Sequence, residues 1–325
     1  MNTMLVQFLA VGIGLAAMVW SARLFVGGAS CIARYLRIPS LVIGMVIIGF
    51  GTSMPELLVS AISSIQNNPG VALGNAFGSN IVNIGLILGL TALIKPIAVA
   101  SAVVKKELPL LLGATAIVGL LAYDRVLSRT DSIILLVLFT ILIGWTIYSA
   151  RKAKGDELER EYEQELSKQM MSPFKAILSL VAGFAVLLAS SRALVWGAVG
   201  IAKTWGVSDL IIGLTIVALG TSLPELASSL VAISRNEHDL AIGNVIGSNL
   251  FNVLAVVGLA GAIRPIELDA AVLIRDWGLM FALTLLALVM GIGIRRQGRI
   301  NRLEGLTLLS VYLAYIAYLA YSQLK

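Results

Sequence analysis

Charge, cysteine and histidine are all scarce in this sequence of 325 residues. Charged residues make up 13% of it and hydrophobic residues 58%, with a mean hydropathy of +0.93. So little charge at so high a hydropathy is typical of a polytopic membrane protein and excludes an ordinary soluble domain. The lone cysteine, Cys31, excludes an intrachain disulfide framework. The lone histidine, His238, lies in a charged turn, where we expect it to be solvated.

Apolar runs long enough to cross a bilayer follow one another along the chain. A transmembrane helix needs about 20 mostly apolar residues. Ten runs approach or exceed this length, at residues 5–25, 41–65, 71–94, 108–123, 132–148, 174–195, 210–233, 240–263, 277–294 and 303–321. The sequence therefore predicts an all-α polytopic membrane protein with ten transmembrane helices, embedded in the lipid bilayer of the plasma (inner) membrane.

Residues 44–96 and 213–265 are two copies of one unit. Laid over each other without a gap, at an offset of 169 positions, they agree at 21 of 53 positions. Such agreement marks an internal duplication. Each copy contains the block Gly-Thr-Ser-x-Pro-Glu, which ends at Glu56 or Glu225, and then the block Gly-Asn-x-x-Gly-Ser-Asn.

Five of the ten predicted spans lie in each half of the chain. We therefore predict a first five-helix repeat at residues 1–150, a solvated cytoplasmic linker at 151–172 and a second five-helix repeat at 173–325. An odd number of spans makes the second repeat enter the membrane from the opposite side, so the repeats are inverted about an axis in the membrane plane. This architecture is characteristic of secondary transporters, which bind substrate where the repeats meet.

The positions of lysine and arginine predict the orientation in the membrane. Cytoplasmic loops are enriched in these residues. With the N-terminus outside, sixteen of them fall in inside loops and six in outside loops, so we predict that both termini lie outside. This topology accounts for the net charge of +6, and no nucleic-acid partner is needed to explain it.

Each copy of the duplicated unit interrupts an apolar span with a proline, Pro55 or Pro224. Proline removes one backbone donor and clashes with the carbonyl four residues earlier, so we expect both helices to break. Non-helical backbone at membrane depth is tolerated where it is buried or lines a cavity. The carbonyl oxygens freed near residues 49–52 and 218–221 are therefore candidate cation ligands.

Side-chain oxygens gather around each predicted break. A glutamate follows each proline, and two hydroxyl residues precede it, Thr52 with Ser53 and Thr221 with Ser222. Such an all-oxygen set suits hard cations such as Ca²⁺ and Na⁺ rather than metals that prefer thiolate or imidazole.

A second polar set comes from the Gly-Asn-x-x-Gly-Ser-Asn blocks and the residues just after them. In each copy, a serine and the asparagine four residues later share one face of the helix, while the intervening asparagine points partly away. We therefore favour four of these side chains as ligands over Asn80 and Asn249: Ser79, Asn83, Ser248 and Asn252. The flanking glycines form small-xxx-small pairs, which we interpret as helix-packing sites.

Glu56 and Glu225 lie in apolar spans that contain no basic residue. Because a charge at the bilayer centre costs at least about 2.5–3.5 kcal/mol, two unpaired acids imply an exogenous cation or a proton. An intramembrane acid protease is disfavoured, because its chemistry does not require the hydroxyls, asparagines and prolines that are repeated around each acid. A passive cation channel is the other competing hypothesis, and it differs in showing flux without a counter-ion.

The two pairs of sequence blocks resemble the two alpha repeats of the sodium/calcium exchanger family, within the calcium/cation antiporter superfamily, and the resemblance covers nearly the whole chain. It implies a ten-helix inverted-repeat fold and exchange of Ca²⁺ for Na⁺ by alternating access. We expect a transporter rather than an enzyme, with these ions as substrates and with no cofactor or obligatory protein partner. By motif position, the resemblance places ion ligands at Gly49, Thr52, Ser53, Glu56, Ser79, Asn83, Ala218, Thr221, Ser222, Glu225, Ser248 and Asn252, with Gly49 and Ala218 acting through backbone carbonyls.

One departure from the family pattern is Asn252, where some relatives carry aspartate. The proton-coupled branch typically carries an additional glutamate near Gly78 and Gly247, so its absence here favours sodium coupling over the alternative, a proton-coupled Ca²⁺/cation antiporter. Two carboxylates neutralise one Ca²⁺, whereas the predicted oxygen set is large enough for more than two Na⁺. We therefore expect electrogenic exchange.

Overall fold

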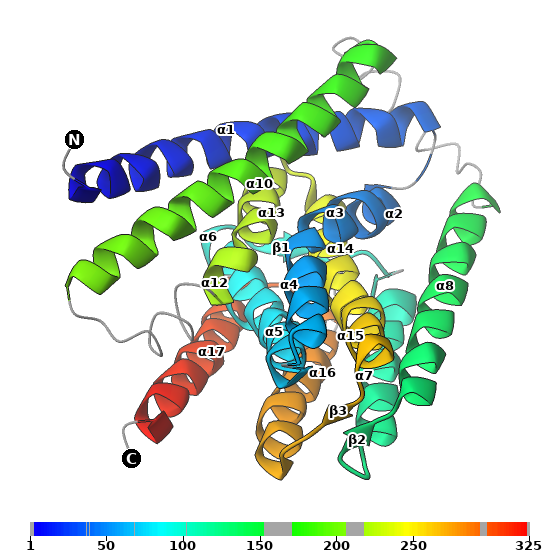
Figure 1. Ribbon diagram of the computed structural model, residues 1–325. Coiled ribbons are helices and arrows are strands. Elements are labelled where there is room, and N and C mark those ends of the chain that lie inside the picture. The colour runs from blue at the N-terminus through cyan, green and yellow to red at the C-terminus, as the bar shows by residue number, and fades with distance from the viewer. Residues whose placement is uncertain are drawn as a thin grey trace.

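The computed structural model describes residues 3–36, 38, 40–67, 69–101, 103–152, 171–205, 218–292 and 298–323. Figure 1 shows a helical protein in which two long helices, α1 (Thr3–Leu36) and α10 (Pro173–Thr204), lie across a bundle formed by the others. Most of the predicted linker at 151–172 lies outside the described residues. So do residues 206–217, which include the start of the seventh predicted span.

The two halves run through similar series of elements. After α1, the first half contains α2 (Ser40–Ile43), the π-helix η1 (Gly44–Gly49), α3 (Phe50–Thr52), α4 (Met54–Ile65), α5 (Pro69–Ile81), the π-helix η2 (Val82–Leu88), α6 (Gly89–Ile94), the π-helix η3 (Val103–Glu107), α7 (Leu108–Leu121) and α8 (Arg129–Lys152). After α10, the described part of the second half contains α12 (Ala218–Thr221), α13 (Leu223–Ser234), α14 (His238–Leu250), the π-helix η6 (Phe251–Val256), α15 (Val257–Ile263), the π-helix η7 (Val272–Trp277), α16 (Gly278–Ile292) and α17 (Arg302–Gln323).

Seven helices within the described ranges are long and apolar enough to span a membrane, or eight if the bent pair Leu41–Thr52 and Met54–Ile65 is one span. The fourth predicted span corresponds to the 14-residue α7, and the seventh is represented by the 12-residue α13. The prediction of a multi-pass helical membrane protein is confirmed, while the number ten stays a prediction.

Four two-residue strands form two antiparallel ladders in the loops. β1 (Ile97–Ala98) pairs with β4 (Arg299–Ile300), and β2 (Val126–Leu127) pairs with β3 (Ile266–Glu267). The expectation of an all-α protein misses these ladders, because strands of two residues carry no alternating pattern. Each ladder joins a loop of the first half to a loop of the second half.

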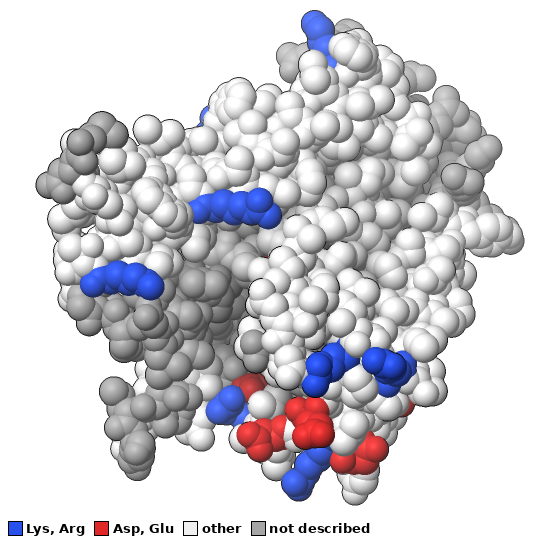
Figure 2. All heavy atoms as spheres, in the orientation of Figure 1, with Lys and Arg blue, Asp and Glu red and all other residues white. Residues whose placement is uncertain are grey.

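The helices α5–α6 and α14–α15 form the centre of the bundle. In their most apolar stretches, 72% and 83% of the residues are buried, against 17% in α1 and in α8. The outer helices therefore leave most of their apolar side chains exposed, as a lipid-facing surface requires. Figure 2 shows the consequence for the surface, which is largely uncharged on this face, with Asp and Glu gathered at the end where β2 and β3 lie.

Glycines allow the closest helix contacts. A Cβ atom at Gly28 of α1 would lie 2.6 Å from the backbone nitrogen of Leu180 in α10. One at Gly243 of α14 would lie 2.5 Å from the carbonyl oxygen of Leu41, so this glycine has the expected packing role. Its repeat counterpart, Gly74, has no described residue within 4 Å of a built Cβ atom.

Candidate functional site

The helix that carries each glutamate begins immediately after a break. α3 ends at Thr52 and α4 begins at Met54, and the bend between Leu41–Thr52 and Met54–Ile65 is 43°. The break residue is Ser53 (φ −84°, ψ 6°), and its repeat counterpart Ser222 has nearly the same backbone (φ −91°, ψ 6°). The predicted breaks are thus confirmed. They fall two residues before the prolines, because the first turn of a helix accommodates proline without losing a hydrogen bond.

Glu56 and Glu225 are buried, and each is held by the break residue of the other repeat. Their exposed fractions are 0% and 1%. The Ser222 hydroxyl donates to Glu56 Oε1 over 3.3 Å. The Ser53 hydroxyl donates to Glu225 Oε1 over 3.0 Å. The second oxygen of each carboxylate, Oε2, is buried and has no hydrogen-bond partner among the described residues, so both are available to a ligand.

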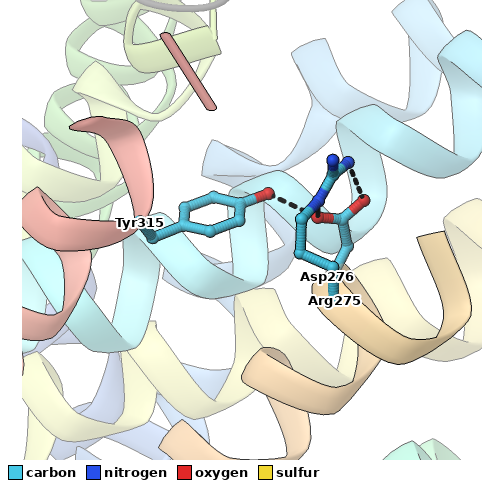
Figure 3. Close-up of polar contacts among 3 residues, drawn as sticks. All are labelled: Arg275, Asp276 and Tyr315. Atoms are coloured by element: carbon cyan, nitrogen blue, oxygen red, sulfur yellow. Dashed lines mark hydrogen bonds and ion pairs between the residues drawn. The ribbon is translucent and has the colours of Figure 1, made fainter. Parts of the chain in front are cut away.

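Two other buried carboxylates, on Glu107 and Asp276, are paired with cations. Arg275 donates from Nε to Asp276 Oδ1 (2.7 Å) and from Nη2 to Oδ2 (2.8 Å), and the Tyr315 hydroxyl donates to Oδ1 (2.8 Å; Figure 3). Lys106 Nζ lies 3.5 Å from Glu107 Oε1. Within the described ranges, no lysine or arginine forms such a pair with the two glutamates at the breaks. Their charge therefore needs compensation from elsewhere.

Four asparagines connect the first repeat to the second. Asn83 Nδ2 donates to Asn249 Oδ1 over 2.9 Å. Asn252 Nδ2 donates to Asn80 Oδ1 over 3.1 Å. The amide oxygens of Asn83 and Asn252 are buried and unpartnered in the described part of the chain. This arrangement supports the choice of Asn83 and Asn252 as ligands, because Asn80 and Asn249 use their oxygens to orient them.

The predicted hydroxyl ligands are buried in the same region of the protein. The exposed fraction is at most 3% for Thr52, Ser53, Ser79, Ser222 and Ser248, and Thr221 is half-buried. Thr52 Oγ1 lies 3.5 Å from Ser248 Oγ, so the break of the first repeat meets the Gly-Ser-Asn block of the second.

The two predicted carbonyl ligands receive less support. The carbonyl oxygen of Gly49 accepts hydrogen bonds from Ser248 Oγ (3.0 Å) and Thr52 Oγ1 (3.2 Å). It also accepts one from the backbone nitrogen of Ser53 (3.2 Å), so it is not freed by the break. Ala218 is the first residue of α12, and its side chain lies outside the described part of the structure.

Asn75 and Asn244 contribute to the site in a way that sequence reasoning missed. Asn75 Nδ2 donates to the backbone oxygen of Glu56 (3.1 Å) and to Ser60 Oγ (2.9 Å). Asn244 makes the same two contacts in the second repeat, since its Nδ2 donates to the backbone oxygen of Glu225 (3.0 Å) and to Ser229 Oγ (2.8 Å). Both asparagines therefore fix the helical turn that carries a glutamate. Both copies of the unit carry asparagine at this position, and this agreement could have identified the two residues from the sequence.

The contacts of the site come in pairs related by the offset of 169 positions. The serine–glutamate, asparagine–glutamate and asparagine–asparagine hydrogen bonds each occur twice, with the roles of the two halves exchanged. Reciprocal contacts of this kind show that the two copies of the unit meet around the two glutamates. A multi-pass membrane protein with buried acids where two such copies meet has the features of an ion transporter.

Comparisons with known proteins agree with this class. The family model described as sodium/calcium exchanger protein matches residues 6–148 and 175–321. The putative antiporter CaxA of Alkalimonas amylolytica is 48% identical over 94% of this chain and 96% of its own. The sodium/calcium exchanger MaX1 of Methanosarcina acetivorans is 30% identical over 94% of this chain and 95% of its own. A solved structure of the sodium-calcium exchanger NCX_Mj, soaked with 10 mM Na⁺ and zero Ca²⁺, matches with a TM-score of 0.84 at 31% identity, covering 97% of this chain and 99% of that one.

The chain belongs to the sodium/calcium exchanger family. Members of this family are membrane antiporters rather than enzymes, and the family resemblance inferred from the two pairs of sequence blocks is confirmed. The family does not by itself assign ligand roles to individual residues.

Proposed function

We propose that this protein exchanges Ca²⁺ for Na⁺ across the membrane by alternating access. The observation that carries the proposal is the burial of Glu56 and Glu225, which accept hydrogen bonds from serines and, among the described residues, have no cationic partner. Two unpaired charges at membrane depth are costly, and one Ca²⁺ or two Na⁺ would balance them. The names of the relatives MaX1 and NCX_Mj, both sodium/calcium exchangers, support the same two substrates.

The proposed ligands come from both repeats. They are the carboxylates of Glu56 and Glu225, the hydroxyls of Thr52, Ser53, Ser79, Thr221, Ser222 and Ser248, the amide oxygens of Asn83 and Asn252, and the carbonyls of Gly49 and Ala218. Calcium takes about six to eight oxygen ligands. The four unpartnered carboxylate and amide oxygens would supply the first of these, and the hydroxyls would complete the set.

The proposed architecture is ten transmembrane helices in two inverted repeats, with both termini outside the inner membrane. The ladders support it, because β1 and β4 lie in loops assigned to the cytoplasmic side and β2 and β3 in loops assigned to the outside. The relative YrbG of Escherichia coli, 40% identical over 84% of this chain and 85% of its own, is named an inner membrane protein.

The charge count makes the proposed exchange electrogenic. Two carboxylates and one Ca²⁺ sum to zero, so the calcium-loaded site would cross the membrane without net charge. The oxygen set is large enough for more than two Na⁺, so the sodium-loaded site would be positive. Each such charge is worth about 2.3 kcal/mol per 100 mV of membrane potential. Sodium and calcium binding would then be mutually exclusive, because both ions need the same two carboxylates.

Calcium efflux from proteoliposomes tests this function. With sodium gradients fixed and the potential set by potassium and valinomycin, we expect efflux that requires external Na⁺ and accelerates when potential favours entry of positive charge. Rates and endpoints indifferent to voltage would contradict electrogenic exchange. Calcium flux driven by a pH gradient without Na⁺ would favour the proton-coupled antiporter. Flux without any counter-ion would favour a channel.

A further inference from the structure

The turn between α13 and α14 holds α1 through two hydrogen bonds. Arg235 Nη2 donates to the backbone oxygen of Arg23 (2.8 Å). The Ser30 hydroxyl donates to Glu237 Oε1 (2.8 Å). A Cβ atom at Gly27 would lie 2.6 Å from Arg235 Nη1, so this glycine makes room for the guanidinium group. The three α1 residues follow one another at intervals of four and three, and therefore lie on one face of the helix.

The turn is also fixed to the bundle on its other side. Lys95 Nζ donates to Asn236 Oδ1 (2.5 Å). The backbone nitrogen of Ala98, in β1, donates to His238 Nδ1 (3.3 Å). The turn is thus anchored to the loop that follows α6, and α1 is held against an anchored part of the bundle.

Glu237 brings a half-buried carboxyl group to this contact. Its Oε2 atom is buried and has no hydrogen-bond partner within the described ranges. Burial raises the pKa of the carboxyl group, and the Ser30 hydroxyl and the guanidinium groups of Arg235 and Arg34 oppose this rise. Arg34 belongs to α1, so this helix also brings positive charge toward the Glu237 carboxylate.

The repeat-related turn lacks these groups. At the offset of 169 positions, Gln66 corresponds to Arg235, and Trp196 of α10 corresponds to Gly27. Gln66 and Asn67 are exposed, and in the described part of the chain their side chains form no hydrogen bond with α10; Trp196 is 53% exposed. Asn67 has a left-handed φ of 70°, and its counterpart has one of 63°. The two turns therefore share a left-handed asparagine at the same position and differ in the side chains at the positions of Arg235 and Gly27.

The helices α1 and α10 cover the two breaks of the proposed ion site. A Cβ atom at Gly51 would lie 3.5 Å from the ring of Phe184 and 3.6 Å from that of Phe25. The Ser191 hydroxyl of α10 donates to the backbone oxygen of Gly220 (3.0 Å). α1 packs along α13, whereas α10 has no comparable contact with α4 among the described residues. Access to the site past these helices requires them to move relative to the bundle.

We infer that Arg235 and Glu237 form a one-sided latch, which holds α1 against the turn at residues 234–238 and favours the state that is closed at the face bearing this turn. The inference rests on the proposed alternating access. If the two repeats had identical sequences, the states closed at either face would be equal in free energy. A contact present at one face alone shifts that equilibrium, and with it the apparent affinity for an ion at each face. Arg235 and Glu237 are positioning residues, because neither is among the proposed ion ligands.

The test compares the half-saturating Ca²⁺ concentration at the two faces of reconstituted protein of known orientation. Arg235→Ala releases α1, so we expect tighter apparent binding at the face bearing residue 235 and weaker binding at the other. The ratio of the two concentrations should change by about tenfold, the value for one lost hydrogen bond to a charged group. Ser30→Ala should change it in the same direction by less. The matched control, Gln66→Ala in the repeat-related turn, should leave the ratio unchanged.

A structural role without a latch would change both half-saturating concentrations by one factor or leave both as they are, and either result overturns the inference. Hydrogen–deuterium exchange of the full-length protein gives a second readout that needs no transport. The amides of residues 23–34 should exchange faster in Arg235→Ala and at the wild-type rate in Gln66→Ala. If wild-type protein shows no Ca²⁺/Na⁺ exchange, the proposed function fails; unchanged protection of residues 23–34 in Arg235→Ala separately overturns the latch.

Discussion

The protein buries two pairs of repeat-related carboxylates, and the pairs differ in how their charge is compensated. Asp276 is held by a guanidinium fork and Glu107 lies beside an ammonium group. Glu56 and Glu225 each accept a hydrogen bond from a serine hydroxyl of the opposite repeat, and neither forms an ion pair within the described ranges. A carboxylate with a cationic neighbour on the same chain has a fixed partner for its charge, whereas one without needs a proton or a cation from outside the chain. This difference distinguishes the proposed ion-transport site from the structural ion pairs at Glu107 and Asp276.

Glutamine at either central position is the strongest test of this comparison. Glu56→Gln and Glu225→Gln should each lower Ca²⁺/Na⁺ exchange at least about 100-fold, because breaking a buried charge pair costs about 3–5 kcal/mol and the bound cation is the partner here. Thermal unfolding in the absence of Ca²⁺ and Na⁺ should occur at or above the wild-type temperature, since removal of an unpaired buried charge relieves a cost. Exchange at the wild-type rate in either variant would sink the assignment.

The asparagines provide the next largest effect. Asn83→Ala removes an unpartnered amide oxygen, and we expect the half-saturating Ca²⁺ concentration to rise about tenfold, as for a lost hydrogen bond to a charged group. Asn80→Ala removes a side chain that orients Asn252, so the increase should be smaller. A larger effect for Asn80 than for Asn83 in calcium uptake assays would reverse the assigned roles.

A smaller change is expected where an asparagine holds only the backbone of a glutamate. Asn75→Ala removes the hydrogen bonds to the Glu56 backbone oxygen and to Ser60, each worth about 1 kcal/mol. We expect a rise of a few fold in the half-saturating concentration for both Ca²⁺ and Na⁺, measured by transport. Ser60→Ala, which removes only the second bond, is the matched control. A change confined to one ion would argue that Asn75 is itself a ligand.

The paired carboxylate should show the opposite pattern, with little effect on transport. Asp276→Asn breaks the pair with Arg275, whose side chain is 32% exposed, so we expect a loss of about 1 kcal/mol after screening and a fall of a few degrees in the unfolding temperature. Tyr315→Phe, which removes one hydrogen bond to the same carboxylate, should cost about as much. If Asp276→Asn abolished exchange while the protein still unfolded at the wild-type temperature, Asp276 would act in transport and the distinction between the two pairs of carboxylates would be wrong.

The two glutamates, the helix breaks and the family could all be predicted from the sequence, because the residues that indicate them occur in both copies of the duplicated unit. Glu56 and Glu225 are recognisable as acids in otherwise apolar spans. The prolines beside them predict helix breaks, and the structure contains these breaks. The family follows from the same two blocks. These signals lie in short stretches of sequence, so they can be recognised without knowing how the repeats pack together.

Contacts between the repeats could not be read in the same way. The hydrogen bond between Asn83 and Asn249 depends on how two helices far apart in sequence pack together. The ion pair of Arg275 with Asp276 joins adjacent residues, which do not face each other on a regular α-helix. It occurs in the π-helix η7, and a single sequence gives no signal for such a turn.

Calcium titration of the purified protein by calorimetry tests the central claim most directly. Without Na⁺, the wild type should bind one Ca²⁺ per chain, and excess Na⁺ should suppress this binding because both ions need the same carboxylates. The double variant Glu56→Gln/Glu225→Gln should bind no Ca²⁺, while Asp276→Asn should bind it as the wild type does. Undiminished Ca²⁺ binding by the double variant would contradict the claim that the two unpaired glutamates form the transport site.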